Sequence, residues 1–165
     1  MSEKVFAYGS NMCSGRFRDY GVVPEEVGRP ALLQDFRLCF NKVSQEDQSG
    51  KANVKAHRGR KVWGVLYTIP DAHLTILDDG EGGYLRKKMP VRTTDGTATK
   101  AWVYVARQPS RDPTLRPYTW YKRFLVEGAR QHGLPDRYVQ TLERIKAKQD
   151  KNKQRDAEKR ALQYE

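Results

Sequence analysis

The sequence predicts a single α+β domain: a small, curved, mostly antiparallel β-barrel with flanking helices. Two patterns along the chain predict this fold class. Up to residue 106, apolar residues alternate with polar ones or form short β-branched and aromatic runs, which is typical of strands. From Pro117 onward, apolar residues recur at helical spacing. The chain has 165 residues and 38% hydrophobic content, which is enough for one compact core.

The first expected strand is apolar from Val5 to Tyr8 and stops at a small polar turn, Gly9-Ser10-Asn11. Every residue of such a turn carries a backbone N–H group, and a turn at a strand end leaves several of these groups without a ladder partner. The sequence therefore predicts a set of fixed hydrogen-bond donors at the end of the first strand.

Two further strands are expected before residue 70. Residues 36–40 alternate between apolar side chains and Arg37 or Cys39, the period of a strand with one face toward a core. Residues 61–69 are β-branched and aromatic, and this run is too short and too apolar for a surface helix.

A short helix and a hairpin follow. Pro70 lies near the expected helix start, and the acidic turn and glycines of residues 78–83 end the helix. Residues 89–94 and 97–106 then flank Asp95-Gly96, a strong signal for a hairpin with a type I′ turn.

Two helices are expected in the last third of the chain. The first covers residues 117–133, and Gly133 and Pro135 mark its end. The second carries Tyr138, Leu142 and Ile145 on one stripe. We assign residues 1–147 to one catalytic domain and expect residues 148–165 to be a charged tail, either a frayed helix or disordered, because it has no apolar stripe that would dock it.

The formal net charge of +11 makes nucleic acid the first partner to consider. The charge is spread along the chain, however: residues 146–165 hold seven Lys/Arg and four Asp/Glu, which contributes only +3. The densest basic stretch, Lys51 to Lys61, contains no aromatic residue for base stacking. Nucleic acid is therefore not the expected main partner, and a solvated basic surface or steering of anionic small molecules explains the charge as well.

The sequence gives no reason to expect a metal ion or a cofactor. Cys13 and Cys39 form no CxxC motif, and His57, His73 and His132 have no partner at ligand spacing. A P-loop, a dinucleotide fingerprint and a GxSxG motif are missing from the sequence. No apolar run is long enough to span a bilayer, and the first residues turn polar before a signal-peptide core could form, so we expect a soluble cytoplasmic protein.

The acidic loop LDDGEGGY (Leu77 to Tyr84) contains the carboxylate best suited to chemistry. A helix-terminating turn explains Asp78 and Asp79 well. It explains Glu81 less well, because glycines on both sides leave this carboxylate on bare backbone that a substrate can approach closely. Apolar neighbours would raise the pKa of such a carboxyl toward neutrality.

Four tyrosines lie near the ends of expected elements: Tyr8, Tyr84, Tyr104 and Tyr121. Each of them is explained by a place in the core, and all four together would suit a pocket. The sequence leaves both interpretations open.

Six stretches in this order resemble the γ-glutamylcyclotransferase family: FAYGSNM, LQDFRLCFN, VWGVLY, LDDGEGGY, AWVYV and YKRFLVEGARQHGLPDRYVQTL. The resemblance covers about residues 4–145. It implies a small mixed barrel with helices and no cofactor. It also implies an intramolecular reaction, in which the α-amine of a γ-glutamyl compound attacks its own γ-carbonyl, releases an amino acid or amine and leaves 5-oxoproline.

The resemblance also implies roles for individual residues. Tyr8, Gly9, Ser10 and Asn11 match the family's substrate-holding loop, and Glu81 matches its catalytic carboxylate. Tyr121, Tyr104 and Tyr84 match tyrosines that line the same pocket. The two glycines between Glu81 and Tyr84 form a shorter link than in many relatives, which implies a reshaped pocket rim.

The sequence therefore predicts a γ-glutamylcyclotransferase-like enzyme whose partner is a small γ-glutamyl substrate. The rival interpretation is a non-catalytic domain of the same fold that binds a ligand or RNA through a basic surface. No membrane partner is expected, and a homodimer is left open.

Overall fold

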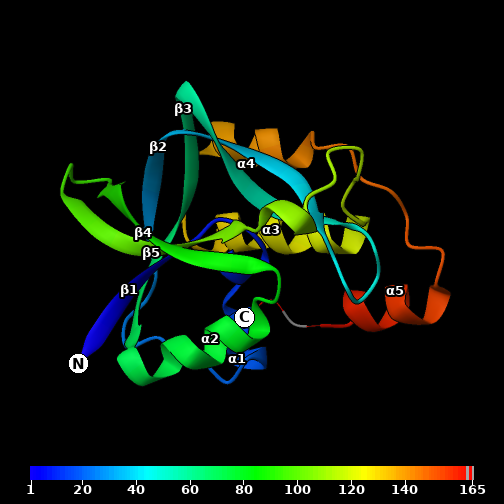
Figure 1. Cartoon of the computed structure of the whole chain (residues 1–165), viewed down its shortest axis with the longest axis horizontal. Coiled ribbons are helices and arrows are strands. Elements are labelled where there is room, and N and C mark those ends of the chain that lie inside the picture. The colour runs from blue at the N-terminus through cyan, green and yellow to red at the C-terminus, as the bar shows by residue number, and fades with distance from the viewer. Residues whose placement is uncertain (163, 165) are drawn as a thin grey trace.

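The computed structural model describes residues 1–162 and Tyr164. In this part of the chain five strands form a closed barrel in the order β1-β3-β2-β4-β5 (Figure 1). The neighbouring strands are antiparallel, except that β1 and β5 close the barrel as a parallel pair at Val5 and Trp102. The strands are β1 (Ser2–Ala7), β2 (Arg29–Val43), β3 (Gly50–Pro70), β4 (Tyr84–Thr93) and β5 (Ala98–Ala106). The predicted α+β barrel is confirmed.

The helices lie outside the barrel (Figure 1). They are α1 (Ser14–Asp19), α2 (Leu74–Gly80), α3 (Thr119–Gln131), α4 (Asp136–Glu143) and α5 (Lys153–Arg160), with short 3₁₀ turns η1 (Ser10–Met12), η2 (Asp71–His73) and η3 (Gln108–Ser110). The helices predicted after Pro70 and Pro117, and the one that carries Tyr138 and Leu142, are confirmed as α2, α3 and α4.

Helix α3 packs on the loop that follows β1. Its Phe124 and Leu125 are fully buried in the core. A Cβ atom on Gly128 would lie only 2.5 Å from the backbone nitrogen of Cys13, so the absence of a side chain lets α3 approach this backbone directly. The position of the β1–α1 loop is therefore fixed by the helix that follows it more than a hundred residues later.

Strands β2 and β3 are longer than predicted. The sequence indicated two short strands at residues 36–40 and 61–69, whereas β2 and β3 pair as one long hairpin from Arg29 and Leu66 to Val43 and Gly50. The basic stretch Lys51–Lys61 is part of β3, and its residues 55–61 are exposed. Charged side chains are compatible with a strand when they project into solvent and the backbone is hydrogen-bonded. A prediction from apolar alternation therefore does not include these residues.

The hairpin between β4 and β5 is confirmed, but its turn is not type I′. Gly96 has φ +87°, whereas Asp95 does not have a positive φ. The Gly96 N–H donates to Thr93 O, and the Thr93 N–H donates to Thr97 O. This is a three-residue loop with glycine at the left-handed position, a common alternative to the two-residue turn.

The expectation of a frayed or disordered segment is corrected for residues 148–162 and Tyr164, while residues 163 and 165 lie outside the described residues. The Lys148 N–H donates to the Pro117 carbonyl, the Lys148 carbonyl accepts from the N–H of Thr119 at the start of α3, and α5 follows at Lys153. The buried carboxylate of Asp150 accepts from the Trp120 indole N–H (3.0 Å) and from the Arg155 guanidinium (2.6 and 2.7 Å). Polar contacts hold this segment in place. A prediction based on apolar stripes does not detect such contacts.

Candidate active site

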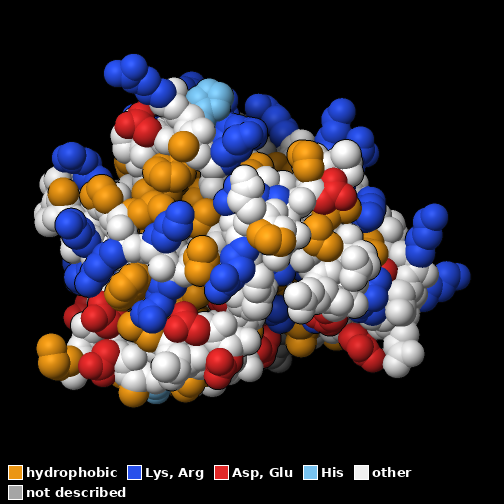
Figure 2. Space-filling view, viewed as in Figure 1, with side chains coloured by type: hydrophobic (Ala, Val, Ile, Leu, Met, Phe, Trp, Pro, Cys, Tyr) orange, Lys and Arg blue, Asp and Glu red, His pale blue; other side chains and the backbone are white. Residues whose placement is uncertain are grey.

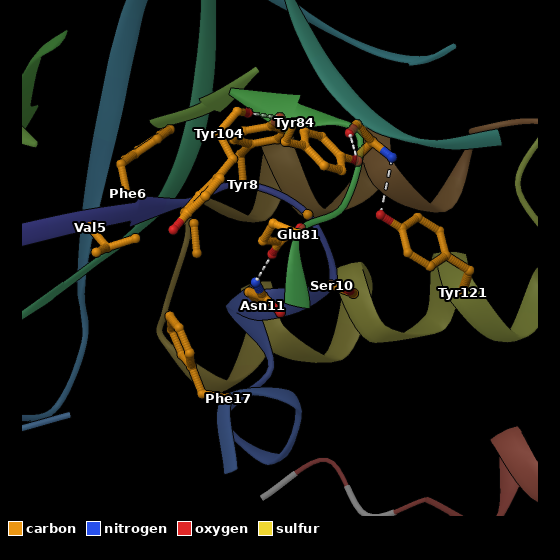
Figure 3. Close-up of a pocket in the computed structure, with 13 residues that line it drawn as sticks. Val5, Phe6, Tyr8, Ser10, Asn11, Phe17, Glu81, Tyr84, Tyr104 and Tyr121 are labelled. Carbon is orange, nitrogen blue, oxygen red and sulfur yellow. Dashed lines mark hydrogen bonds between the residues drawn. The ribbon is translucent and has the colours of Figure 1, made fainter. Parts of the chain in front are cut away.

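The end of β1 and the loop after α2 meet over a small cavity of about 50 Å³, which we call the inner cavity. Figure 3 shows Glu81 and Asn11 at its centre, with Tyr8, Tyr84 and Tyr104 to one side and Tyr121 across from them. The cavity is lined by Val5, Phe6, Ala7, Tyr8, Gly9, Ser10, Asn11, Phe17, Ala52, Glu81, Tyr84, Tyr104 and Tyr121.

Glu81 is the residue directly after α2, which ends at Gly80. Its Oε1 atom accepts a hydrogen bond of 2.5 Å from the side-chain amide of Asn11. Burial raises the pKa of Glu81 to about 7, and the Asn11 amide and the positive charge of Lys42 lower it less than burial raises it. A carboxyl with a pKa near 7 exchanges protons readily in both directions at neutral pH.

Asn11 reaches Glu81 because the chain passes very close to β3 and α3 at Gly9. A Cβ atom on Gly9 would lie 3.1 Å from the Cβ of Ala52 and 3.3 Å from the Tyr121 hydroxyl. The turn η1 then begins at Ser10. The first N–H groups of a helical turn have no partner within that turn, so this short element presents donors beside the cavity.

Tyr84 and Tyr121 are both tied to Ala52 in β3. The Tyr84 hydroxyl donates to the Ala52 carbonyl at 2.6 Å, and the Ala52 N–H donates to the Tyr121 hydroxyl at 3.0 Å (Figure 3). Since the Tyr121 oxygen is the acceptor there, its own proton can be donated into the cavity. Burial raises the pKa of Tyr121 to about 12, so the hydroxyl stays protonated at neutral pH.

Tyr8 and Tyr104 connect β1, β5 and α2. The Tyr8 hydroxyl donates to the Tyr104 carbonyl, and the Tyr104 hydroxyl donates to Asp78 Oδ1 at 2.7 Å. Arg86 also contacts Asp78, at 3.2 Å. Asp78 therefore does more than end α2: it fixes the ring that closes one side of the cavity.

The structure thus brings together the eight residues that the sequence singled out: Tyr8, Gly9, Ser10, Asn11, Glu81, Tyr84, Tyr104 and Tyr121. The short link between Glu81 and Tyr84 does not remove Tyr84 from the cavity. Sequence reasoning missed Ala52, because a small residue in a basic stretch has no chemical signal of its own. It also missed Lys42, which follows an apolar strand and carries no motif.

A second cavity of about 230 Å³, which we call the outer cavity, adjoins the inner cavity at Glu81. Four residues line both cavities: Ser10, Glu81, Tyr84 and Tyr121. The rest of the outer wall is basic and aromatic, and includes Arg16, Tyr20, Lys42, Lys51, Trp120 and Lys159. Burial lowers the pKa of Lys51 to about 8, although the ammonium is 3.3 Å from the buried carboxylate of Asp47.

Metal-binding clusters and membrane-spanning helices are both absent from the part of the chain that the structure describes. Among residues 1–162 and Tyr164, no group of three His, Cys, Asp or Glu side chains is arranged to hold a metal ion. In the same part of the chain, no helix combines the length and the apolar character needed to cross a membrane.

Comparison with known proteins identifies the family. The model of the AIG2-like family matches residues 61–142. The γ-glutamylcyclotransferase of mouse is 31% identical over 158 residues, which span 90% of this chain and 81% of the mouse protein. The human γ-glutamylcyclotransferase is 32% identical over 150 residues, which span 85% of this chain and 77% of the human protein.

The solved structures agree. A γ-glutamyl cyclotransferase structure superposes on 92% of this chain with a TM-score of 0.83 and 28% sequence identity, and 92% of that structure is covered. The chain therefore belongs to the γ-glutamylcyclotransferase family and is a γ-glutamylcyclotransferase-like enzyme.

Proposed function

We propose that the enzyme converts γ-glutamyl amino acids or γ-glutamyl amines to 5-oxoproline and the free amino acid or amine. One observation carries the proposal: Glu81 supplies the one carboxyl among the described residues that line the inner cavity, its pKa is raised to about 7, and it lies next to a turn rich in backbone donors. The family membership supports the same reaction class.

Glu81 is proposed to act first as a general base and then as a general acid. At neutral pH the α-amine of the substrate is mostly an ammonium, which has no lone pair for attack. The Glu81 carboxylate takes a proton from it, and the free amine then forms a bond to its own γ-carbonyl carbon. The C–N bond to the leaving group breaks as Glu81 gives this proton to the departing nitrogen. The ring nitrogen loses its second proton, and the released amine takes up one proton to become an ammonium. The products are therefore neutral lactam and ammonium, the Glu81 carboxylate is regenerated, and no other reactant is consumed.

The turn Gly9-Ser10-Asn11 is proposed to stabilise the negative charge that develops on the γ-carbonyl oxygen. Backbone N–H groups at such a position are already oriented and need no rearrangement during the reaction. Tyr121 is proposed to assist them, because its hydroxyl proton can point into the cavity while its oxygen accepts from the Ala52 N–H.

Asn11 is proposed to orient both Glu81 and the substrate amine. Its amide nitrogen holds Glu81 Oε1. Its amide oxygen is buried and has no donor among the residues that the structure describes. A buried acceptor without a donor is costly, and a substrate ammonium beside Glu81 would supply one.

The remaining parts of the proposal concern class, place and partners. The enzyme would be a 5-oxoproline-forming lyase or acyltransferase of glutathione metabolism that acts in the cytoplasm. Its partner would be a small γ-glutamyl compound rather than nucleic acid or a membrane. Figure 2 supports this choice of partner, since Lys and Arg side chains are scattered over the face it shows instead of forming one stripe. A homodimer stays a prediction.

The test is product formation from γ-glutamyl-alanine by the purified full-length enzyme. We expect 5-oxoproline and alanine to appear in equal amounts, at a rate proportional to enzyme concentration. Release of glutamate and alanine without 5-oxoproline would mean that water, not the substrate amine, attacks the carbonyl, and would contradict the proposal. The absence of any product from a panel of γ-glutamyl amino acids and amines would contradict it as well.

A further inference from the structure

Lys42 is a buried lysine without a partner. Only 5% of the residue is exposed. Among the residues that the structure describes, its ammonium makes no hydrogen bond and no ion pair; the nearest aromatic group is the Tyr84 ring, whose centroid lies 5.3 Å away. Buried charges in proteins are normally paired, because an isolated one costs considerable free energy.

Lys42 lines the outer cavity, and it lies at an irregular point of strand β2. A register shift between Cys39 and Lys42 interrupts the pairing of β2 with β3, and irregularities of this kind re-aim side chains. The side chain passes against the backbone of the loop that carries Glu81: a Cβ atom on Gly83 would lie 2.7 Å from Lys42 Cε and 2.9 Å from Nζ. The absence of a side chain at Gly83 is what makes room for Lys42.

Neighbouring cations of the outer cavity are already paired. Lys51 contacts Asp47 at 3.3 Å, and Lys159 contacts Glu46 at 3.6 Å. Arg16 contacts Asp19 at 3.3 Å. Lys42 therefore differs from them in having its charge available to a ligand. Since the cavity has four cationic residues (Arg16, Lys42, Lys51 and Lys159) against Glu46 and Glu81, a ligand with negative charge suits it best.

Because Glu81 lines both cavities, its position indicates which part of a substrate would enter the outer cavity. In the proposed function, on which this inference rests, Glu81 protonates the leaving nitrogen. That proposal places the γ-glutamyl group in the inner cavity, which Gly9, Ser10 and Asn11 line, so the atoms beyond the leaving nitrogen extend into the adjoining outer cavity. In an α-amino acid, one carbon separates that nitrogen from the carboxylate, which brings the carboxylate close to the neighbours of Glu81.

We propose that the outer cavity is the leaving-group subsite and that Lys42 binds the carboxylate of the departing amino acid. Lys42 thereby makes the carboxylate of the leaving group a determinant of turnover. Acidic leaving groups are favoured over basic ones, because the other cations of the cavity add to the field of Lys42.

The test compares two substrates that differ in one charge. γ-Glutamyl-alanine and γ-glutamyl-alaninamide have nearly the same shape, but only the first has a carboxylate on its leaving group. A hydrogen bond to a charged group is worth enough to give the acid a kcat/KM about ten- to 100-fold above that of the amide. A wild-type ratio within about threefold of one would overturn the proposal.

Substitution of Lys42 assigns the preference to one residue. In Lys42→Met, which keeps the apolar stem, the acid-to-amide ratio should fall to within about threefold of one. The experiment compares the acid-to-amide ratio of kcat/KM, because loss of the Lys42 charge would change the proton transfer by Glu81 equally for both substrates. Lys100→Met removes an exposed lysine from β5 that lines neither cavity, and it should keep the wild-type ratio. A Lys42→Met enzyme that retains the full ratio would overturn the role of Lys42.

The outcome also separates this inference from the proposed function. No 5-oxoproline from either substrate contradicts the proposed function itself, whereas equal turnover of both contradicts only the assignment of the outer cavity. If Lys42→Met does not fold, inhibition of the wild-type enzyme by alanine and by alaninamide decides: alanine should inhibit about ten-fold more strongly or better, and equal inhibition would overturn the proposal.

Discussion

At the residue scale, the sequence predicted the identity of the candidate catalytic group but not its surroundings. Glycines on both sides of one glutamate pointed to Glu81. The sequence could not tell that Asn11, 70 positions earlier, would donate to it, because that contact depends on how the barrel closes. Nor could it distinguish tyrosines of the core from tyrosines of a pocket: here Tyr8, Tyr84 and Tyr104 line the cavity and also use their hydroxyls to hold neighbouring elements.

The raised pKa of Glu81 has a consequence for stability. Burial raises this pKa from 4.5 to about 7, so the folded state binds more protons than the unfolded state between these values. The stabilisation by the protonated form is complete below pH 4.5 and is lost as the pH rises through about 7. The wild-type protein therefore carries a buried charge at alkaline pH that a neutral side chain would not.

We predict that Glu81→Gln raises the free energy of unfolding at pH 8 by about 3 kcal/mol, and that the gain nearly vanishes by pH 4. Glutamine can still accept from Asn11 and keeps the volume. Chemical denaturation of both proteins across this pH range measures the difference. Glu158→Gln, which changes an exposed glutamate of α5, serves as the control and should show no such trend. A gain of the same size at pH 4 and pH 8 would show that Glu81 is not destabilised by burial of its charge.

At the scale of elements, the sequence predicted α2, α3, α4 and the β4–β5 hairpin, because each follows from a local period or a turn signal. It failed for the segment after residue 148. That segment is held by one carboxylate, Asp150, whose partners Trp120 and Arg155 lie 30 residues before it and five after it. Hydrophobic periodicity does not register contacts of this kind. The same contacts bear on the outer cavity, since Trp120 and the α5 residue Lys159 both line it.

We predict that Asp150→Ala lowers the free energy of unfolding by about 2–3 kcal/mol, because it leaves the buried Trp120 N–H without an acceptor and Arg155 without its anion. Thermal or chemical unfolding of the purified variant measures this loss. Arg155 lowers the pKa of Asp150 to about 2, so this contribution is present above the carboxyl's unfolded value near 4 and is lost only as the pH falls through about 2.

The matched control for this prediction is Glu158→Ala, which removes an exposed carboxylate from α5 and should change stability little. If Asp150→Ala were no less stable than the control, the segment after residue 148 would not be held by Asp150.

At the scale of the whole molecule, the barrel topology brings residues that are distant in the sequence together in one site. The parallel contact of β1 with β5 closes the barrel, and β1 ends at the donor turn. The loop that carries Glu81 runs from α2 into β4, and Tyr121 comes from α3. The change from strand to helix periods along the chain was enough to predict the fold class. Strand order, the long β2–β3 hairpin and the two cavities depend on contacts between distant residues, which periodicity does not encode.

The structure also shows where some of the residues behind the net charge of +11 lie. Part of it lies on the exposed face of β3, and part lines the outer cavity next to Glu81. In the proposal for the outer cavity, this second part would bind the carboxylate of a small substrate.

The central claim is that Glu81 carries the proton transfers of a γ-glutamylcyclotransferase, and turnover of γ-glutamyl-alanine by Glu81→Gln tests it most directly. An amide can neither take a proton from the substrate ammonium nor return one to the leaving nitrogen. General acid–base catalysis typically contributes 10²–10⁴-fold, so we predict that 5-oxoproline formation falls by about that factor or more. Calorimetry should still detect substrate binding, because the donor turn is intact. A Glu81→Gln enzyme within about threefold of the wild-type rate would contradict the account, since the proton transfers would then belong to another residue.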